Sequence, residues 1–170
     1  HTGRHAGRWR RACWHWPRPR CLPRRPSRDT GLVPRLPAID RVSANPGPYI
    51  ENWEDCPHLL AIYLLAEFRE TRALDSFIRF FSLPEDDAFD LTGDMITEQG
   101  AAMLASVCGG DPGPLLRLIR NESINEYVCS QAIDALVIQC GWGERPRDAV
   151  IANLRDLVRT LPRPGKPFIW

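Results

Sequence analysis

A run of carboxylates near the middle of the chain comes closest to a set of residues that could do chemistry. It comprises Glu85, Asp86, Asp87, Asp90 and Asp94. Asp86, Asp90 and Asp94 are spaced four apart, so a continuous helix would place them on one face, where carboxylates can hold a hard cation. These three are the candidate metal ligands, and the hypothesis they support is a metal-dependent hydrolase. Carboxylates in a first helical turn also stabilise the helix dipole without any ligand, and we favour that structural interpretation.

The cysteine and histidine residues do not complete a second site. Cys56 and His58 can supply two zinc ligands, but no second pair follows at a standard spacing. Cys13, His15 and Cys21 form an equally incomplete set. The sequence also contains no nucleophile elbow and no glycine-rich phosphate loop. It therefore predicts no catalytic residue, no cofactor and no metal beyond the three aspartates.

The apolar pattern predicts the helices that would position these residues. Pairs of apolar helical runs, separated by short polar or glycine turns, recur between about residues 56 and 161. The offset from Leu65 to the equivalent Leu104 is 39 residues, which is typical of stacked helix–turn–helix units. Nothing alternates with a period of two, so no sheet is predicted. The expected fold class is all-α, a short α-solenoid of antiparallel helix pairs in which Leu104 belongs to the core.

Capping signals predict where these helices begin. Pro57 should open a helix that is apolar on more than one side and hence central. The expected N-caps of three later helices are Thr71, Thr97 and Ser123, the last in a capping box with Glu126. The candidate helix over residues 86–96 contains Gly93, and we expect a break between Asp94 and Thr97. Alanine at position 93 should then be tolerated or only mildly destabilising. Phe80 is the one aromatic residue expected to face outward.

The charge of the chain divides it into two parts. Residues 1–50 hold eleven arginines against two acids and half of the sixteen prolines, whereas residues 51–170 carry a net charge of −8. We therefore predict a basic Arg/Pro/Trp-rich arm over residues 1–47 and a helical-repeat domain over residues 48–170. Prolines at this density argue against a stable helix or a central strand, so the arm should be non-native sequence, or disordered or extended with a short helical turn near Ile39–Ser43. Its arginines and tryptophans leave nucleic-acid or anionic-membrane binding open, but only through this arm.

The six cysteines favour a reducing compartment. None forms a CxxC pair, and four of them stand in or beside apolar helical stretches. We therefore expect reduced thiols in a cytoplasmic protein. The longest apolar run, residues 59–66, is too short to cross a bilayer, so no membrane span is predicted. The chain starts at His1 and is expected to be a fragment.

Several motifs are similar to those of one bacterial family. They are the segments 62–73, 82–84, 90–94, 96–98, 104–107, 125–128 and 168–170. On these motifs, residues from about 44 to 170 resemble the bacterial domain-of-unknown-function family 1186, whose members have HEAT-like helical repeats. The resemblance implies a HEAT-like repeat fold in a bacterial cytoplasmic protein, and it implies no activity. Family members can continue into a C-terminal zinc motif of cysteine and histidine, which is absent here, so zinc is not implied.

The function these observations favour is a protein-protein interaction module with an unknown protein partner. Stacked helix pairs offer extended faces for binding, and the sequence lacks a complete catalytic set. The first alternative is the metal-dependent hydrolase that uses Asp86, Asp90 and Asp94. The second alternative is nucleic-acid binding through the basic arm, because a folded part with net charge −8 has the wrong sign for phosphate contact.

Overall fold

The structure, a computed structural model, describes residues 35–161 except residues 53 and 55. Regular structure in this part of the chain is helical, and the only bridges pair residues 84 and 85 with Ile124. The predicted all-α fold class is therefore confirmed. The helices, with one short 3₁₀ turn η2, are α1 (Leu36–Ala44), α2 (Gly47–Glu51), α3 (Pro57–Glu67), η2 (Thr71–Ala73), α4 (Leu74–Phe81), α5 (Asp87–Thr92), α6 (Asp94–Cys108), α7 (Gly113–Arg120), α8 (Glu126–Gly141) and α9 (Arg147–Thr160).

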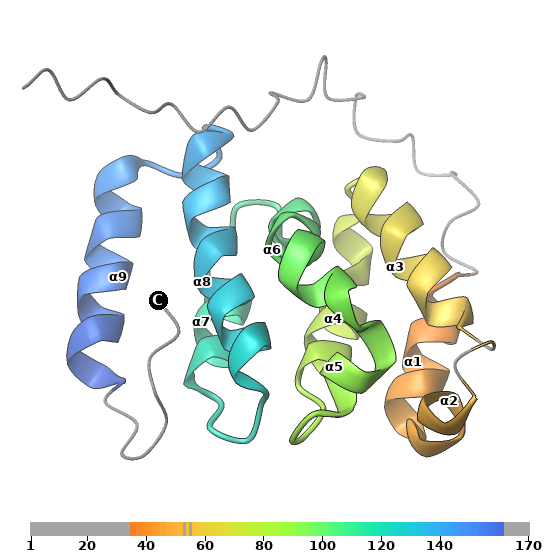
Figure 1. Ribbon diagram of the computed structural model, residues 1–170. Helices are drawn as coiled ribbons and strands as arrows, with labels where there is room; N and C mark the ends of the chain where they lie inside the picture. The colour runs from red at the N-terminus through yellow and green to blue at the C-terminus, as the bar shows by residue number, and fades with distance from the viewer. Residues whose placement is uncertain (1–34, 53, 55, 162–170) are drawn as a thin grey trace, which may run out of the picture.

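The longer helices form two layers (Figure 1). Helices α1, α4 and α7 lie in one layer and α3, α6 and α8 in the other, with α9 packed on α8. The contact between α6 and α8 is the most extensive in the described part of the chain. The paired order agrees with stacked helix–turn–helix units, while the solenoid and HEAT-like descriptions stay predictions.

The central helix is α6 rather than α3. Ten of the fifteen residues of α6 are buried, because α3, α4, α7 and α8 all pack against it. Helix α3 begins at Pro57 as predicted, but Leu60 is 57% exposed and Tyr63 is 40% exposed. Within the described residues α3 has a neighbour of its own layer, α6, on one side only. Its apolar composition therefore does not place it at the centre.

Helix α1 corrects the predicted domain boundary. Ile39 and Val42 are fully buried, and α1 packs on both α3 and α4. Asp40 accepts a hydrogen bond from Arg79 on α4 at 2.7 Å. The folded part therefore extends at least to Leu36, which the predicted boundary leaves in the arm. Pro37 does not oppose the helix because it lies in the first turn, where its missing N–H costs nothing. Residues 1–34 of the arm lie outside the described residues.

The three predicted N-caps are wrong, although each lies within three residues of an observed helix start. At the first start, the side chain of Glu70 accepts a hydrogen bond from the backbone N–H of Arg72 at 3.1 Å. Helix α6 already begins at Asp94, and the Thr97 hydroxyl donates back to the Asp94 carbonyl. The cap of α8 is Asn125 rather than Ser123. Hydroxyl side chains near a helix start have several backbone partners, so proximity in sequence does not identify the cap.

Phe80 faces the core instead of the solvent. It is fully buried, and its ring centroid lies 5.3 Å from that of Phe81 and 5.7 Å from that of His58. The buried face of α4 consists of residues 76, 77, 80 and 81. Both phenylalanines of the Phe80–Phe81 pair therefore belong to it. The exposed Arg79 beside Phe80 belongs to the opposite face.

Three turns meet at one end of the helices, where α3, α6 and α8 end (Figure 1). Arg69, in the turn after α3, forms an ion pair with Glu144 in the turn after α8 and lies 4.6 Å above the Trp142 ring. The turn after α6 contributes Gly109 and Gly110, both with positive φ. A Cβ atom on Gly110 would meet the backbone oxygen of Glu144 at 3.4 Å. The contact alone would admit a Cβ atom, so the glycines are needed for the left-handed backbone of the middle turn, across which the two outer turns approach.

Replacing Gly93 with alanine is expected to lower the free energy of unfolding by about 1–3 kcal/mol. Gly93 separates α5 from α6 with φ of 54° and ψ of −140°, a backbone conformation that residues with a Cβ rarely adopt. No heavy atom lies within 4 Å of the added Cβ, so the cost is purely conformational. This expected loss is larger than the tolerance or mild destabilisation that the sequence suggested. The predicted division into two helices is confirmed, but it falls at Gly93 and not between Asp94 and Thr97. The matched control is Gly47→Ala, because Gly47 has an ordinary φ and equal space for a Cβ atom. Urea unfolding of both variants measures the difference between their free energies of unfolding.

Candidate functional site: an acidic pocket

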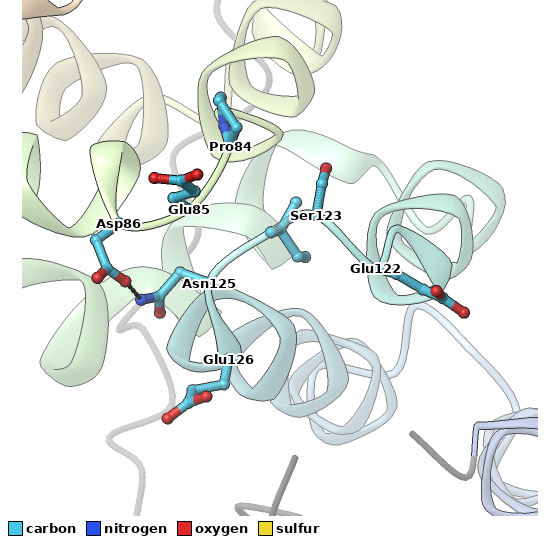
Figure 2. A pocket seen from close by; sticks show the side chains of 8 residues that line it. Pro84, Glu85, Asp86, Glu122, Ser123, Asn125 and Glu126 are labelled. Atoms are coloured by element: carbon cyan, nitrogen blue, oxygen red, sulfur yellow. Dashed lines mark hydrogen bonds between the residues drawn. The ribbon is translucent and has the colours of Figure 1, made fainter. Parts of the chain in front are cut away.

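A pocket of about 400 Å³ lies between two loops at the opposite end of the helices from the three turns. The first loop connects α4 to α5, and the second connects α7 to α8. The lining residues are Pro84, Glu85, Asp86, Glu122, Ser123, Ile124, Asn125 and Glu126 (Figure 2). The backbone N–H of Glu85 donates to the carbonyl of Ser123 at 3.0 Å, so the loops are joined directly. Ile124 is buried beneath them.

The side-chain amide of Asn125 forms hydrogen bonds through both its oxygen and its nitrogen at the pocket. Its oxygen accepts a hydrogen bond from the backbone N–H of Tyr127 at 2.8 Å and thereby caps α8. Its nitrogen donates to a carboxylate oxygen of Asp86 at 2.6 Å (Figure 2). The side chain is only 8% exposed. One buried amide therefore connects the starts of α5 and α8 and holds the carboxylate of Asp86 in place.

The pocket is strongly negative. Four of its lining residues are carboxylates, and none is a lysine or arginine. None of these four acids forms an ion pair with another residue of the described chain. Figure 2 shows Glu85 and Asp86 on the side of the first loop, with the Glu122 carboxylate pointing away at the far end of the second. Glu85 has a φ of 52°, a left-handed conformation that costs a residue with a side chain about 1 kcal/mol or more.

An aromatic pair lies next to the pocket residues. Phe89 of α5 and Tyr127 of α8 have ring centroids 5.3 Å apart, with their planes tilted by 31°. Tyr127 is 38% exposed, whereas Phe89 is half-buried. Phe89 is one helical turn after Asp86, and Tyr127 directly follows Glu126. The same two helix starts therefore present both carboxylates and an exposed aromatic ring.

The three candidate metal ligands are not on one helical face. Asp86 precedes α5, Asp90 lies within it, and Asp94 starts α6 after the reversal at Gly93. No group of three potential metal ligands gathers anywhere in the part of the chain that the structure describes. A spacing of four residues places side chains on one face only in a continuous helix, and Gly93 interrupts the helix here. The geometry therefore gives the metal-dependent hydrolase no support.

The zinc pair Cys56 and His58 gains no support from the structure either. His58 is buried, with Nε2 bonded to the carbonyl of Leu91 at 2.8 Å, and so connects α3 to α5 inside the core. Cys56 is the residue before α3. Burial raises the pKa of another thiol, Cys108, to about 12, so this cysteine is uncharged near neutral pH and unsuited to nucleophilic chemistry. Cys13, His15 and Cys21 lie outside the described residues, and the nucleic-acid hypothesis for the arm stays a prediction.

Asp86 and Glu126 were predicted to have structural or metal-binding roles, but neither was assigned to a pocket. Asn125, which donates to Asp86 and directly precedes Glu126, was not predicted to have a role. The available signal was an asparagine directly before an amphipathic run, which is among the strongest N-cap preferences. The pairing of residues 84–85 with residues 123–124 had no sequence signal, because those segments are 39 residues apart.

Replacing Asn125 with alanine should lower the free energy of unfolding by about 1–3 kcal/mol. The substitution removes the cap of α8 and deprives the Asp86 carboxylate of its donor. Ser123→Ala is the matched control, because its hydroxyl donates only to Asn121 at the surface, and we expect a loss below about 0.5 kcal/mol. Thermal or urea unfolding of both variants gives the comparison. A larger loss of free energy of unfolding for Ser123→Ala would favour Ser123 as the N-cap, as in the predicted capping box. It would contradict the assignment of Asn125 as the cap of α8.

These features define the class of protein: an all-α protein of two helical layers with an acidic pocket at one end of the helices. The family model for a protein of unknown function, DUF1186, matches residues 26–170, and the chain belongs to this family. It is 39% identical over 119 residues to a protein of Chlamydia muridarum and 38% identical over 119 residues to one of Chlamydia trachomatis serovar D. These alignments cover 69% of this chain and 47% of each relative, so the chain spans about half the length of the curated relatives it matches. No solved structure gives a significant match.

The described helices can also be compared with the length and apolar character of a membrane-spanning helix. None of those between residues 35 and 161 combines the length and the apolar character that a membrane-spanning helix needs.

Proposed function

We propose that this protein is a protein-interaction module that binds a basic segment of its partner at the acidic pocket. The observation that carries the proposal is the set of four carboxylates at two joined loops, none of them in an ion pair with a described residue. Carboxylates without an internal counter-charge leave a negative potential at the surface, which attracts a basic partner and orients it.

The loops also meet the requirement of pre-organisation. The backbone bond from Glu85 to Ser123 and the side-chain bond from Asn125 to Asp86 hold the two segments against each other. A rigid site loses less conformational entropy on binding than a mobile one, so more of the contact energy appears as affinity. The described chain as a whole, with eleven arginines against nineteen acids, favours the same kind of partner.

The test is affinity capture with chemical cross-linking from a bacterium that encodes the protein, with the full-length protein as bait. Three baits are compared: the wild type, the pocket variant Glu85→Gln/Glu126→Gln, and the control Glu67→Gln/Asp148→Asn. The control removes the same charge at the other end of the helices. Asp148 is the first-turn acid of α9 as Glu126 is of α8, so the change in helix-dipole energy is matched.

We expect the wild type and the control to capture the same partner, with cross-links to the pocket loops. Capture by the pocket variant should fall about tenfold, and raised salt should weaken the wild-type complex in the same way. Undiminished capture by the pocket variant would place the interaction elsewhere on the surface. Failure of all three baits to capture any partner would count against an interaction module.

A further inference from the structure

We infer that the partner residue recognised here is arginine, with its guanidinium stacked on the exposed ring of Tyr127 and its N–H groups directed to the neighbouring carboxylates. This inference rests on the proposed function and adds the chemistry of the partner. It is carried by the aromatic pair Phe89–Tyr127, a surface feature separate from the pocket itself. An exposed aromatic ring in an acidic surrounding is complementary to a planar cation.

The aromatic pair is held in a fixed position. Tyr127 occupies the first turn of α8, and its backbone N–H is the group that the buried Asn125 caps. Phe89 supports the ring from α5 at a centroid distance of 5.3 Å. Tyr127 remains 38% exposed in spite of this contact. A supported ring that keeps this much exposed surface can stack with a ligand without rearrangement.

Carboxylates adjoin the two aromatic residues in the sequence of both helices. Glu126 precedes Tyr127 on α8, and Asp90 follows Phe89 on α5. Asp86 lies one turn before Phe89 on α5, and one of its carboxylate oxygens already accepts the amide of Asn125. A guanidinium offers five N–H donors in a plane, so it can stack on the ring and donate to carboxylates at the same time. A lysine ammonium is a compact and strongly hydrated charge that gains less from an aromatic surface.

The same combination occurs elsewhere within this chain. The guanidinium of Arg69 lies 4.6 Å from the centre of the Trp142 ring and forms an ion pair with Glu144. That internal arrangement joins an aromatic ring, a carboxylate and an arginine across two turns. At the start of α8 the ring and the carboxylates are present, and no arginine of the described residues forms an ion pair with these carboxylates or a cation–π contact with the Tyr127 ring.

The experiment titrates the full chain with two peptides and follows the backbone amide signals by NMR. One is a ten-residue Gly/Ser peptide with three arginines, and the other has lysine at those three positions. At low salt the arginine peptide should bind about two- to fivefold more tightly and should shift the signals of residues 125–127, since a cation–π contact at an exposed site contributes about 0.5–1 kcal/mol. Tyr127→Leu should abolish this preference, whereas Tyr127→Phe, which retains the ring, should preserve it.

The outcomes separate the inference from the proposed function. If both peptides bind equally, and Glu85→Gln/Glu126→Gln weakens both, arginine recognition is overturned and the acidic binding site stands. If neither peptide binds, both proposals fail. Residues 1–34 contain nine arginines and are an alternative occupant. A salt-dependent shift of the Tyr127 signal without any peptide, lost in Tyr127→Leu, would assign the site to this segment and overturn recognition of a separate partner.

Discussion

Leu104→Ala is expected to lower the free energy of unfolding by about 2–5 kcal/mol. Leu104 is fully buried in α6, the helix that four others cover in the described part of the chain. Truncation at this position removes apolar contacts and leaves a cavity between the two layers, which rigid neighbouring helices cannot close. The measurement is the urea midpoint and slope of the full chain with and without the substitution.

Leu60→Ala is the matched control for this experiment. It removes the same atoms from a leucine that is 57% exposed on α3, so the loss should stay below about 1 kcal/mol. Both leucines belong to apolar helices in the sequence, and only their burial differs. Equal and small losses at the two positions would show that Leu104 is not in the core and that the assignment of the layers is incorrect.

Phe80→Ala is the second substitution with a large expected effect, about 3–5 kcal/mol. The Phe80 ring contacts Phe81 on its own helix and His58 on α3, so its loss affects the contact between the two layers. His58 is in turn hydrogen-bonded to the carbonyl of Leu91 at the end of α5. The removal of Phe80 therefore opens a cavity beside a buried polar group, which adds to the cost of the lost apolar contacts.

Phe68→Ala serves as the control, because Phe68 lies at the end of α3 and is 39% exposed. We expect it to lose less than half as much free energy as Phe80→Ala. Thermal unfolding followed by circular dichroism is suitable for both variants. A loss at Phe80 no greater than that at Phe68 would contradict the buried face of α4 and favour the outward orientation that the sequence suggested.

The acids at the pocket end of the molecule have two different origins. Asp87, Asp90, Asp94 and Glu126 occupy the first turns of α5, α6 and α8, where a negative charge complements the helix dipole. Glu85 and Glu122 are in loops and receive no such stabilisation. The structural interpretation of the acidic run therefore accounts for much of it. Glu85, a loop carboxylate at the pocket that helix stability does not require, is the one that most directly supports a binding role.

The sequence by itself was sufficient for the fold class and for most helix ends. Apolar spacing of three and four residues predicted helices throughout, and the glycine pair after Cys108 ended α6 with Gly109 in the left-handed conformation as expected. Pro57 began α3, and α9 ended at Thr160 before Pro162. These features depend on local sterics and backbone hydrogen bonding, so nearby residues are enough to decide them.

Only the tertiary structure decided which helix is central and which residues cap the helices. It also decided which acidic side chains lie together at the pocket. Leu60 and Leu104 have similar local surroundings, and their different burial follows from the number of helices packed around each. The acidic pocket joins Glu85 and Asp86 to Asn125 across 39 residues of sequence. The structure gives the metal hypothesis no support for a related reason, since it assumed a continuous helix where Gly93 turns the chain. Local spacing determines which side chains share a helical face, but contacts between loops depend on how whole helices stack, and stacking minimises exposed apolar surface over the entire domain.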